Sequence, residues 1–216
     1  MSKKNAAVSL KDLVYRGIIE QICTGALPPR SVITEKQMIE TFGVSKSPVR
    51  EALIQLCAEN VLESMPRYGY QIIPVTAKDV QDLTELRLYL EVSSLHKVLE
   101  NITPAQLEEL RAQNERRHQN EESKTVWTAW NNNRDFHMQL ISYAGNTQVT
   151  LALNRALTTY RRAYAMAYVS QREQMTAIHS GVLHDMVVNA LEEHDLTAAR
   201  NALGKDIGAV EMDWLG

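Results

Sequence analysis

The first third of the chain shows helical spacing of its apolar residues. Two glycines, Gly25 and Gly43, stand where such segments end. A first helix is predicted from about Ser9 to Thr24, and two more over residues 34–42 and 45–59. The apolar positions that define the first helix recur at helical spacing: Leu10, Leu13, Val14, Ile18 and Ile22.

The spacing then changes to that of short strands. Residues Leu62–Met65 and Tyr70–Pro74 flank the turn sequence Pro66-Arg67-Tyr68-Gly69, which predicts a β-hairpin. Three short helices followed by a small hairpin are typical of a winged helix-turn-helix. We therefore predict such a domain over residues 1–75.

From residue 76 onward the pattern is helical throughout, which predicts an all-helical bundle over residues 76–216. The fold class is therefore mainly α. A break near Ser170 leaves open whether the bundle has six helices or seven. The predicted helices are Thr76–Glu100, Thr103–Glu122, Thr125–Tyr143, Thr147–Val169, Gln171–Glu193 and Asp195–Trp214.

The composition is that of a globular protein, with 44% hydrophobic and 23% charged residues among 216. No apolar run approaches the roughly 18 residues that a membrane-spanning helix needs, and no apolar stretch follows the N-terminal lysines as in a signal peptide. The two cysteines, Cys23 and Cys57, lie within apolar helical patterns. They predict reduced thiols and a cytoplasmic protein without a membrane partner.

Charge is divided unequally between the two predicted domains. Residues 1–75 carry nine Lys and Arg against seven Asp and Glu, whereas residues 76–216 carry fourteen against nineteen. The net charge of -3 is therefore the sum of a basic first domain and an acidic second domain. A basic module joined to an acidic one is consistent with phosphate binding by the first domain alone.

Residues 42–53 form the strongest motif, Phe-Gly-Val-Ser-Lys-Ser-Pro-Val-Arg-Glu-Ala-Leu. Gly43 supplies a tight turn and Ser45 an N-cap, so the following helix directs free N–H groups outward. Ser47 and Arg50 fall on its outer side, with Lys46 at the leading edge, as a recognition helix in the major groove requires. An ordinary helical hairpin with a solvated basic face shares this pattern, and the hairpin that follows favours DNA binding.

Residues 13–74 resemble the DNA-binding domain of the GntR family of bacterial regulators. The resemblance rests on Ile33-Thr34-Glu35, on Ser45 to Leu53, and on a hairpin with Gly69. Arg30 and Asn60 stand where the family usually has Gly, and Lys46 where Arg is commoner. The resemblance implies DNA contacts by Lys36, Ser45, Lys46, Ser47, Arg50, Arg67, Tyr68 and Gly69.

Four polar residues of the second domain form a candidate metal site. Asn133 and His137 are four residues apart and share a helix face, while His184 and Asp206 lie on later helices. Side chains from different helices of a bundle can converge on one divalent ion. The spacing alone equally fits two histidines that form local hydrogen bonds.

Residues 80–208 resemble the FCD domain, the ligand-binding partner in the FadR-type branch of that family. Arg87 and Glu91 match its first helix, the segment 133–146 its central pattern, and His184 its last. Many members hold a divalent ion with an Asp four residues before a first His, together with three His, and the ion helps to bind a carboxylate effector.

This chain has Asn133 in the place of that Asp and Asp206 in the place of the last His, and residues 154–164 contain no His. Either a harder divalent ion binds at Asn133, His137, His184 and Asp206, or the cavity binds an acid without metal. Effector contacts are predicted for Arg87, His137, His184 and Arg162, because a guanidinium pairs with carboxylates.

Together these features predict a ligand-responsive DNA-binding regulator and not an enzyme. The resemblance implies a homodimeric repressor of metabolic genes that reads a pseudo-palindromic operator and senses a small organic acid. Two alternatives remain: a small metalloenzyme with a His/Asp centre, and a dimerisation module with a vestigial pocket. An enzyme has no use for residues 34–70, and no second carboxylate lies at helical spacing from His137 or His184.

Overall fold

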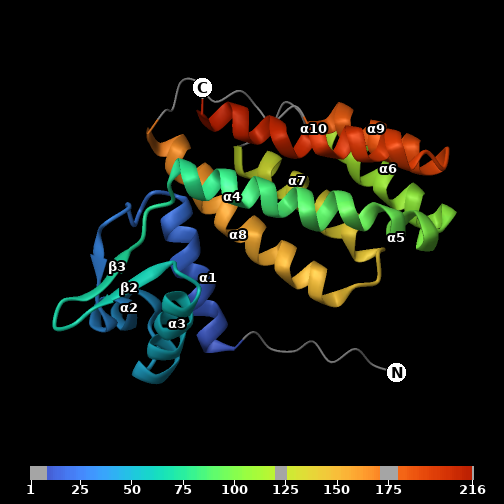
Figure 1. Ribbon diagram of the computed structural model, residues 1–216. Coiled ribbons are helices and arrows are strands. Elements are labelled where there is room, and N and C mark those ends of the chain that lie inside the picture. Colours follow the sequence, from blue (N-terminus) through green and yellow to red (C-terminus); the bar gives the residue numbers. More distant parts are fainter. Residues whose placement is uncertain (1–8, 120–125, 171–179, 216) are drawn as a thin grey trace, which may run out of the picture. The chain divides into compact units, whose positions relative to one another are not determined.

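The computed structural model describes residues 9–119, 126–170 and 180–215, and its chain divides into two compact units (Figure 1). The first unit runs to Val75 and also includes Arg162–Ser170. The second comprises Thr76–Arg161 and the described residues after position 179. The first division falls where the sequence predicts a domain boundary. The assignment of residues 162–170 to the first unit differs from the predicted range of 76–216.

Local capping explains where the helices of the first unit begin and end. Helix α1 (Leu10–Cys23) starts after Ser9, whose side chain accepts a hydrogen bond from the backbone N–H of Asp12. Helix α2 (Glu35–Phe42) starts with a reciprocal capping box between Thr34 and Gln37 and ends at a left-handed Gly43. Helix α3 (Lys46–Ala58) follows directly, and its apolar residues Val49, Ala52, Leu53 and Leu56 are buried.

A small antiparallel sheet completes this unit. Strands β2 (Leu62–Met65) and β3 (Gly69–Ile72) form the predicted hairpin, and β1 (Val32–Ile33) pairs with the other edge of β3. The sequence analysis did not predict β1, because two residues are too short to show alternation. Gly69 has a φ of 127°, and a Cβ there would lie 2.3 Å from the carbonyl oxygen of Ile33. Glycine is therefore needed for β1 to approach β3.

The second unit is helical throughout its described residues. The predicted helix over 76–100 is divided by a π-helical turn, η1 (Leu88–Val92), which periodicity alone does not reveal. The predicted start at Gln171 lies outside the described residues. The helices are α4 (Ala77–Arg87), α5 (Ser93–Asn101), α6 (Pro104–Gln119), α7 (Val126–Ser142), α8 (Thr147–Ser170), α9 (Ser180–Glu192) and α10 (Leu196–Leu215).

One apolar core joins these helices and surrounds a few polar side chains. Helix α10 packs along α9 and also contacts α4 and η1, while α6 packs against both α7 and α9. No helix in the described part of the chain is long and apolar enough to cross a membrane. The buried apolar residues of this core include Leu95, Phe136, Leu140, Val187, Val188, Leu203 and Ile207.

Candidate nucleic-acid interface and metal centre

The N-terminal end of α3 presents cations and backbone N–H groups to solvent. Ser45 occupies the N-cap position, but its side chain makes no capping hydrogen bond. The side chains of Lys46 and Arg50 are 69% and 64% exposed. Between them, the Ser47 Oγ donates to Glu51 Oε1 at 2.9 Å. An exposed cationic helix N-terminus is suited to a phosphate oxygen or to the edge of a guanine.

A single carboxylate connects this helix end with α2 and the sheet. The two oxygens of Glu35 lie 3.4 Å from Lys46 Nζ and 4.0 Å from Arg50 Nε. The hydroxyl of Tyr70 on β3 donates to the same carboxylate at 3.5 Å. Glu35 therefore contacts both cations of the recognition helix and strand β3 of the hairpin, a role that was not predicted for it.

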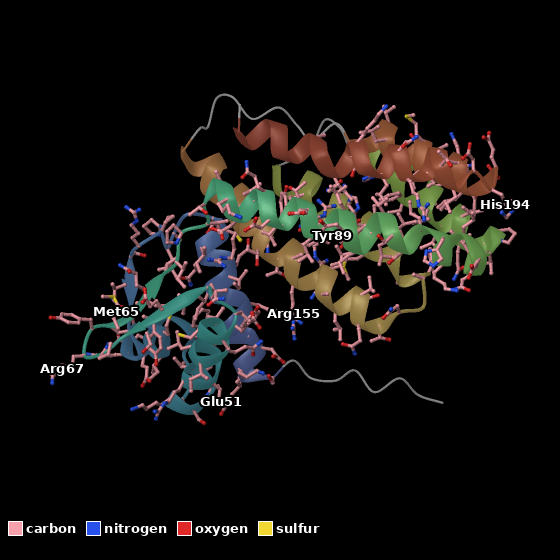
Figure 2. All side chains as sticks on the ribbon, viewed as in Figure 1. Glu51, Met65, Arg67, Tyr89, Arg155 and His194 are labelled. Carbon is pink, nitrogen blue, oxygen red and sulfur yellow. The ribbon has the colours of Figure 1, made fainter. Side chains whose placement is uncertain are left out.

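The remaining DNA-contact candidates lie on α2 and at the hairpin tip. Lys36 on α2 is 86% exposed and lies 3.9 Å from Glu40. Arg67 extends from the tip of the hairpin, where its φ is 73° (Figure 2). The neighbouring Tyr68 is 73% exposed, an unusual position for a large ring. All the predicted DNA-contact residues thus belong to one compact unit, on α2, on α3 and at the hairpin tip.

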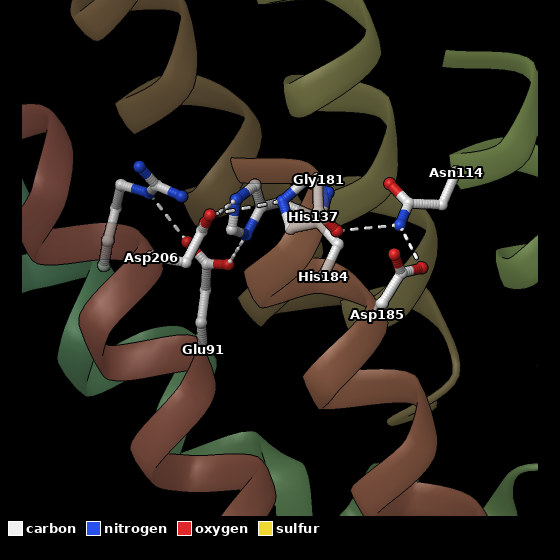
Figure 3. A network of polar contacts seen from close by, with 8 residues as sticks. Glu91, Asn114, His137, Gly181, His184, Asp185 and Asp206 are labelled. Atoms are coloured by element: carbon white, nitrogen blue, oxygen red, sulfur yellow. Dashed lines mark hydrogen bonds and ion pairs between the residues drawn. The ribbon is translucent and has the colours of Figure 1, made fainter. Parts of the chain in front are cut away.

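In the second unit, residues from three helices converge on one buried point (Figure 3). His137 comes from α7, His184 from α9 and Asp206 from α10. The His137 Nε2 lies 2.9 Å from Asp206 Oδ2, and the His184 Nε2 lies 3.5 Å from Asp206 Oδ1. None of the three is more than 2% exposed. Three of the four candidate metal ligands therefore lie close together.

A second layer of contacts holds these rings in place. The His137 Nδ1 lies 2.5 Å from Glu91 Oε2, and Arg87 Nε donates to Glu91 Oε1 at 2.7 Å. The ring of His184 stacks on Phe136 with centroids 3.7 Å apart. Glu91 lies within the π-turn η1, and such turns are frequent at functional sites. In the sequence, Glu91 was named only as a match, with Arg87, to the first helix of the FCD domain, and no contact with His137 was predicted for it.

The buried cluster carries a net negative charge when its two imidazoles are neutral. Burial raises the pKa of Glu91, but Arg87 and His137 outweigh it and hold that pKa below its usual value. Burial likewise raises the pKa of Asp206, yet the two imidazoles lower it far more. Burial lowers the pKa of His137, and the Glu91 carboxylate more than reverses this. With both imidazoles neutral, two carboxylates face one guanidinium, so a proton or a metal ion is favoured.

The donor atoms also fit a metal ion in their geometry. His137 Nε2 and Asp206 Oδ2 are close, yet they are not aligned for a hydrogen bond with each other. Atoms bound at about 2.1 Å on adjacent positions around one ion lie roughly 3 Å apart. The separations of 2.9 and 3.5 Å, which run to the two different oxygens of Asp206, are close to this spacing. One ligand atom from each of the three residues lies within 4.8 Å of the others. Asn133, one helical turn before His137, is buried, and its amide lacks a hydrogen bond to any described residue.

Two family profiles match the chain along its length. Residues 10–72 match the bacterial regulatory proteins of the gntR family, and residues 82–209 match the FCD domain. The chain belongs to the GntR family. It has the FCD type of second domain, as the resemblance implied, and its winged helix-turn-helix and helical bundle are confirmed.

Individual relatives of this GntR protein are regulators by name. The HTH-type transcriptional regulator McbR of Escherichia coli is 31% identical over 62% of this chain. That alignment spans only 60% of McbR. A probable D-xylose utilization operon transcriptional repressor of Paenarthrobacter nicotinovorans is 26% identical over 96% of this chain and 90% of its own length. Both names favour the regulator hypothesis over the metalloenzyme alternative.

A solved structure shares the whole fold. The structure of E. coli McbR/YncC superposes with a TM-score of 0.78 at 22% identity, covering 97% of this chain and all of that one. At this identity the likeness establishes the fold alone.

Two of the predicted effector contacts are arginines, Arg87 and Arg162, and each has partners within its own unit. Arg87 lies in the buried cluster, and its Nη2 lacks a hydrogen-bond partner among the described residues. Its guanidinium also lies 5.5 Å from the centroid of the Tyr160 ring. Arg162 instead belongs to the first compact unit, where its Nη2 donates to the carbonyl of Ile73 at 2.9 Å. Arg87 therefore reaches the buried cluster through its contact with Glu91, and an effector contact by Arg162 stays a prediction.

Proposed function

We propose that this GntR protein is a cytoplasmic transcriptional repressor. Its first unit binds operator DNA, and its second unit senses a small organic acid through a divalent metal ion. The observation that carries the sensing part is that three buried polar groups, the Nε2 of His137, the carboxylate of Asp206 and the amide of Asn133, lack hydrogen-bond partners among the described residues. Native proteins leave few such groups, so the group indicates a bound ion or ligand.

DNA binding is assigned to the exposed N-terminal end of α3. Arg50 and Lys46 contact base edges in the major groove, Ser45 and Ser47 contact phosphate, and Lys36 lies alongside. The hairpin tip at residues 67–69 contacts the neighbouring backbone or minor groove. Two copies of the chain would read a pseudo-palindromic operator with recognition helices about 34 Å apart.

The metal ion would be held by His137, His184 and Asp206, with Asn133 as a weak fourth ligand. When bound, the ion supplies a Lewis acid for a carboxylate oxygen. Arg87 supplies a guanidinium whose Nη2 is buried without a partner among the described residues. A small carboxylic acid satisfies both, since one anionic group can meet the ion and the guanidinium together. The ion and Arg87 therefore define the effector class.

Metal content tests the sensing site directly. The purified protein is expected to contain one divalent ion per chain by inductively coupled plasma mass spectrometry, and to bind Mn²⁺ or Zn²⁺ by calorimetry after chelation. The Asp206→Ala variant is expected to lose this ion. The Asp135→Ala variant, which removes an exposed carboxylate of α7, serves as the control. No bound ion and no binding in the wild type would contradict the proposal and leave a vestigial pocket.

Selection from random DNA duplexes, followed by fluorescence anisotropy, tests the DNA-binding site. The Arg50→Ala variant should lose roughly 1–3 kcal/mol of discrimination at one base position, as a lost bidentate contact to a guanine does. Arg155→Ala, an exposed arginine of α8, is the control. Equal losses in both variants would argue against a base contact by Arg50.

A further inference from the structure

Glu91 bridges two buried partners and does not itself belong to the converging donor set. One of its oxygens accepts from Arg87 Nε at 2.7 Å, and the other lies 2.5 Å from His137 Nδ1 (Figure 3). Arg87, Glu91 and His137 are all fully buried. The three residues that could hold an ion are His137, His184 and Asp206, so Glu91 contacts the site only through the far side of one imidazole.

This arrangement decides which ring nitrogen of His137 carries the proton. A neutral imidazole has one N–H and one lone pair. With the proton on Nε2, the lone pair of Nδ1 would face the Glu91 carboxylate at 2.5 Å, which places two acceptors together in a buried site. With the proton on Nδ1, the ring donates to Glu91 across the shorter of its two carboxylate contacts. The lone pair of Nε2 then faces Asp206 Oδ2 at the longer distance of 2.9 Å, where a bound cation would relieve the repulsion.

We propose that Glu91 is the positioning residue of the buried centre: it holds His137 as the Nδ1–H tautomer and turns Nε2 toward the other donors. Arg87 in turn fixes the carboxylate, because its guanidinium occupies the second oxygen of Glu91. The π-turn η1 carries Glu91, while Arg87 ends α4 immediately before it. Arg87 and Glu91 are thus four residues apart in the sequence, and Glu91 contacts the ring of His137, which lies 46 positions after it.

The consequence for metal binding rests on the proposed sensing function, whereas the tautomer does not. Outer carboxylates that accept from a ligating imidazole raise its basicity and fix its orientation. Their loss typically costs about 10–100-fold in metal affinity. We therefore expect Glu91 to govern Mn²⁺ affinity although it holds no ion itself.

The tautomer is measured by nitrogen-15 NMR of histidine-labelled, metal-free protein at alkaline pH, where the ring is neutral. The wild type should show His137 protonated at Nδ1. The Glu91→Gln variant removes the carboxylate but leaves Arg87 buried without a counter-charge, which can unfold the protein. The double variant Arg87→Met with Glu91→Gln removes both charges and keeps the test possible. In either folded variant the Nε2–H form should appear.

Mn²⁺ affinity, measured by calorimetry, gives the second readout. The Glu91→Gln and double variants should bind Mn²⁺ roughly 10–100-fold more weakly than the wild type. The Glu85→Gln variant is the matched control, because Glu85 is an exposed residue of α4 that accepts only from Tyr89 in the described structure. Unchanged affinity in the double variant, or a wild-type His137 protonated at Nε2, would overturn the inference. If the wild type bound no Mn²⁺, the sensing function would be overturned. The positioning role of Glu91 would then be tested by the tautomer measurement alone.

Discussion

At the scale of single residues, Glu35 stands out because its carboxylate lies beside two exposed cations of α3. Its carboxylate is the nearest anion to Lys46 Nζ, at 3.4 Å, and lies 4.0 Å from Arg50 Nε. Partly exposed ion pairs of this kind contribute little to stability, about 0.2–1 kcal/mol each. Their main effect is to restrict where the two cations can point and to repel phosphate nearby.

The Glu35→Gln variant should therefore bind non-specific DNA more tightly, by roughly two- to fivefold, given the weakness of such pairs. It should also discriminate less between operator and random duplex, because Lys46 and Arg50 lose a common anchor. Fluorescence anisotropy with both duplexes measures the ratio. The Glu40→Gln variant removes the same charge from α2, beside Lys36. An identical effect of the two substitutions would show a general charge effect instead of positioning.

Asn133 is one of the positions at which this chain departs from the pattern of the family. An Asn133→Asp substitution adds a carboxylate to a buried cluster that already holds Glu91 and Asp206. The metal-free variant should unfold at a lower temperature because like charges repel in a buried site. Mn²⁺ should raise its unfolding temperature more than that of the wild type, since the ion gains an anionic ligand. Thermal unfolding with and without Mn²⁺ measures both effects, and an unchanged metal-free midpoint would contradict the reasoning.

At the scale of elements, the hairpin depends on one close approach between strands. Replacing Gly69 by Ala places a Cβ 2.3 Å from the Ile33 carbonyl oxygen, at a φ of 127° that other residues rarely adopt. We expect a loss of about 1–3 kcal/mol in the stability of the first unit, typical of strained backbone. DNA binding should weaken, while Mn²⁺ binding in the second unit should persist.

Gly208→Ala is the matched control for that substitution. Its Cβ would meet nothing within 4 Å, and alanine favours the helix α10 over glycine by about 0.5–1 kcal/mol. Chemical denaturation should therefore give opposite signs for the two alanine variants. If Gly69→Ala proved neutral, the pairing of β1 with β3 would not depend on glycine.

The elements that local chemistry specifies were predictable, and those that depend on distant contacts were not. Ser9, Thr34 and Gly43 mark helix ends by capping and by φ, so their positions follow from neighbouring residues. The convergence of His137, His184 and Asp206 was predictable from the family pattern. By contrast, β1 exists only because β3 lies beside it, and the contact of Glu91 with His137 spans 46 positions. The periodicity of apolar residues within one segment cannot predict the pairing of β1 with β3 or the contact of Glu91 with His137.

At the scale of the whole molecule, stability should depend on pH and on metal in linked ways. Glu91 and Asp206 have pKa values lowered from 4.5 and 3.8, so the stability they contribute is present above those values and is lost as the pH falls through their folded pKa values. The pKa of His137 is raised from 6.5. Its contribution is complete below that value and is lost as the pH rises through the folded pKa.

A metal ion and a proton then compete to neutralise the same buried negative charge. Below the folded pKa of His137, the imidazole is protonated and Mn²⁺ must displace that proton to bind. Above that pKa the imidazole is neutral, so Mn²⁺ binds without the free-energy cost of removing a proton. The increase in unfolding temperature caused by Mn²⁺ should therefore grow as the pH rises through the folded pKa of His137. The Asp206→Asn variant should show little increase at any pH. A stabilisation by Mn²⁺ that is equal from acid to alkaline pH would place the ion away from His137, because only a ligand that releases its proton couples metal binding to pH in this way.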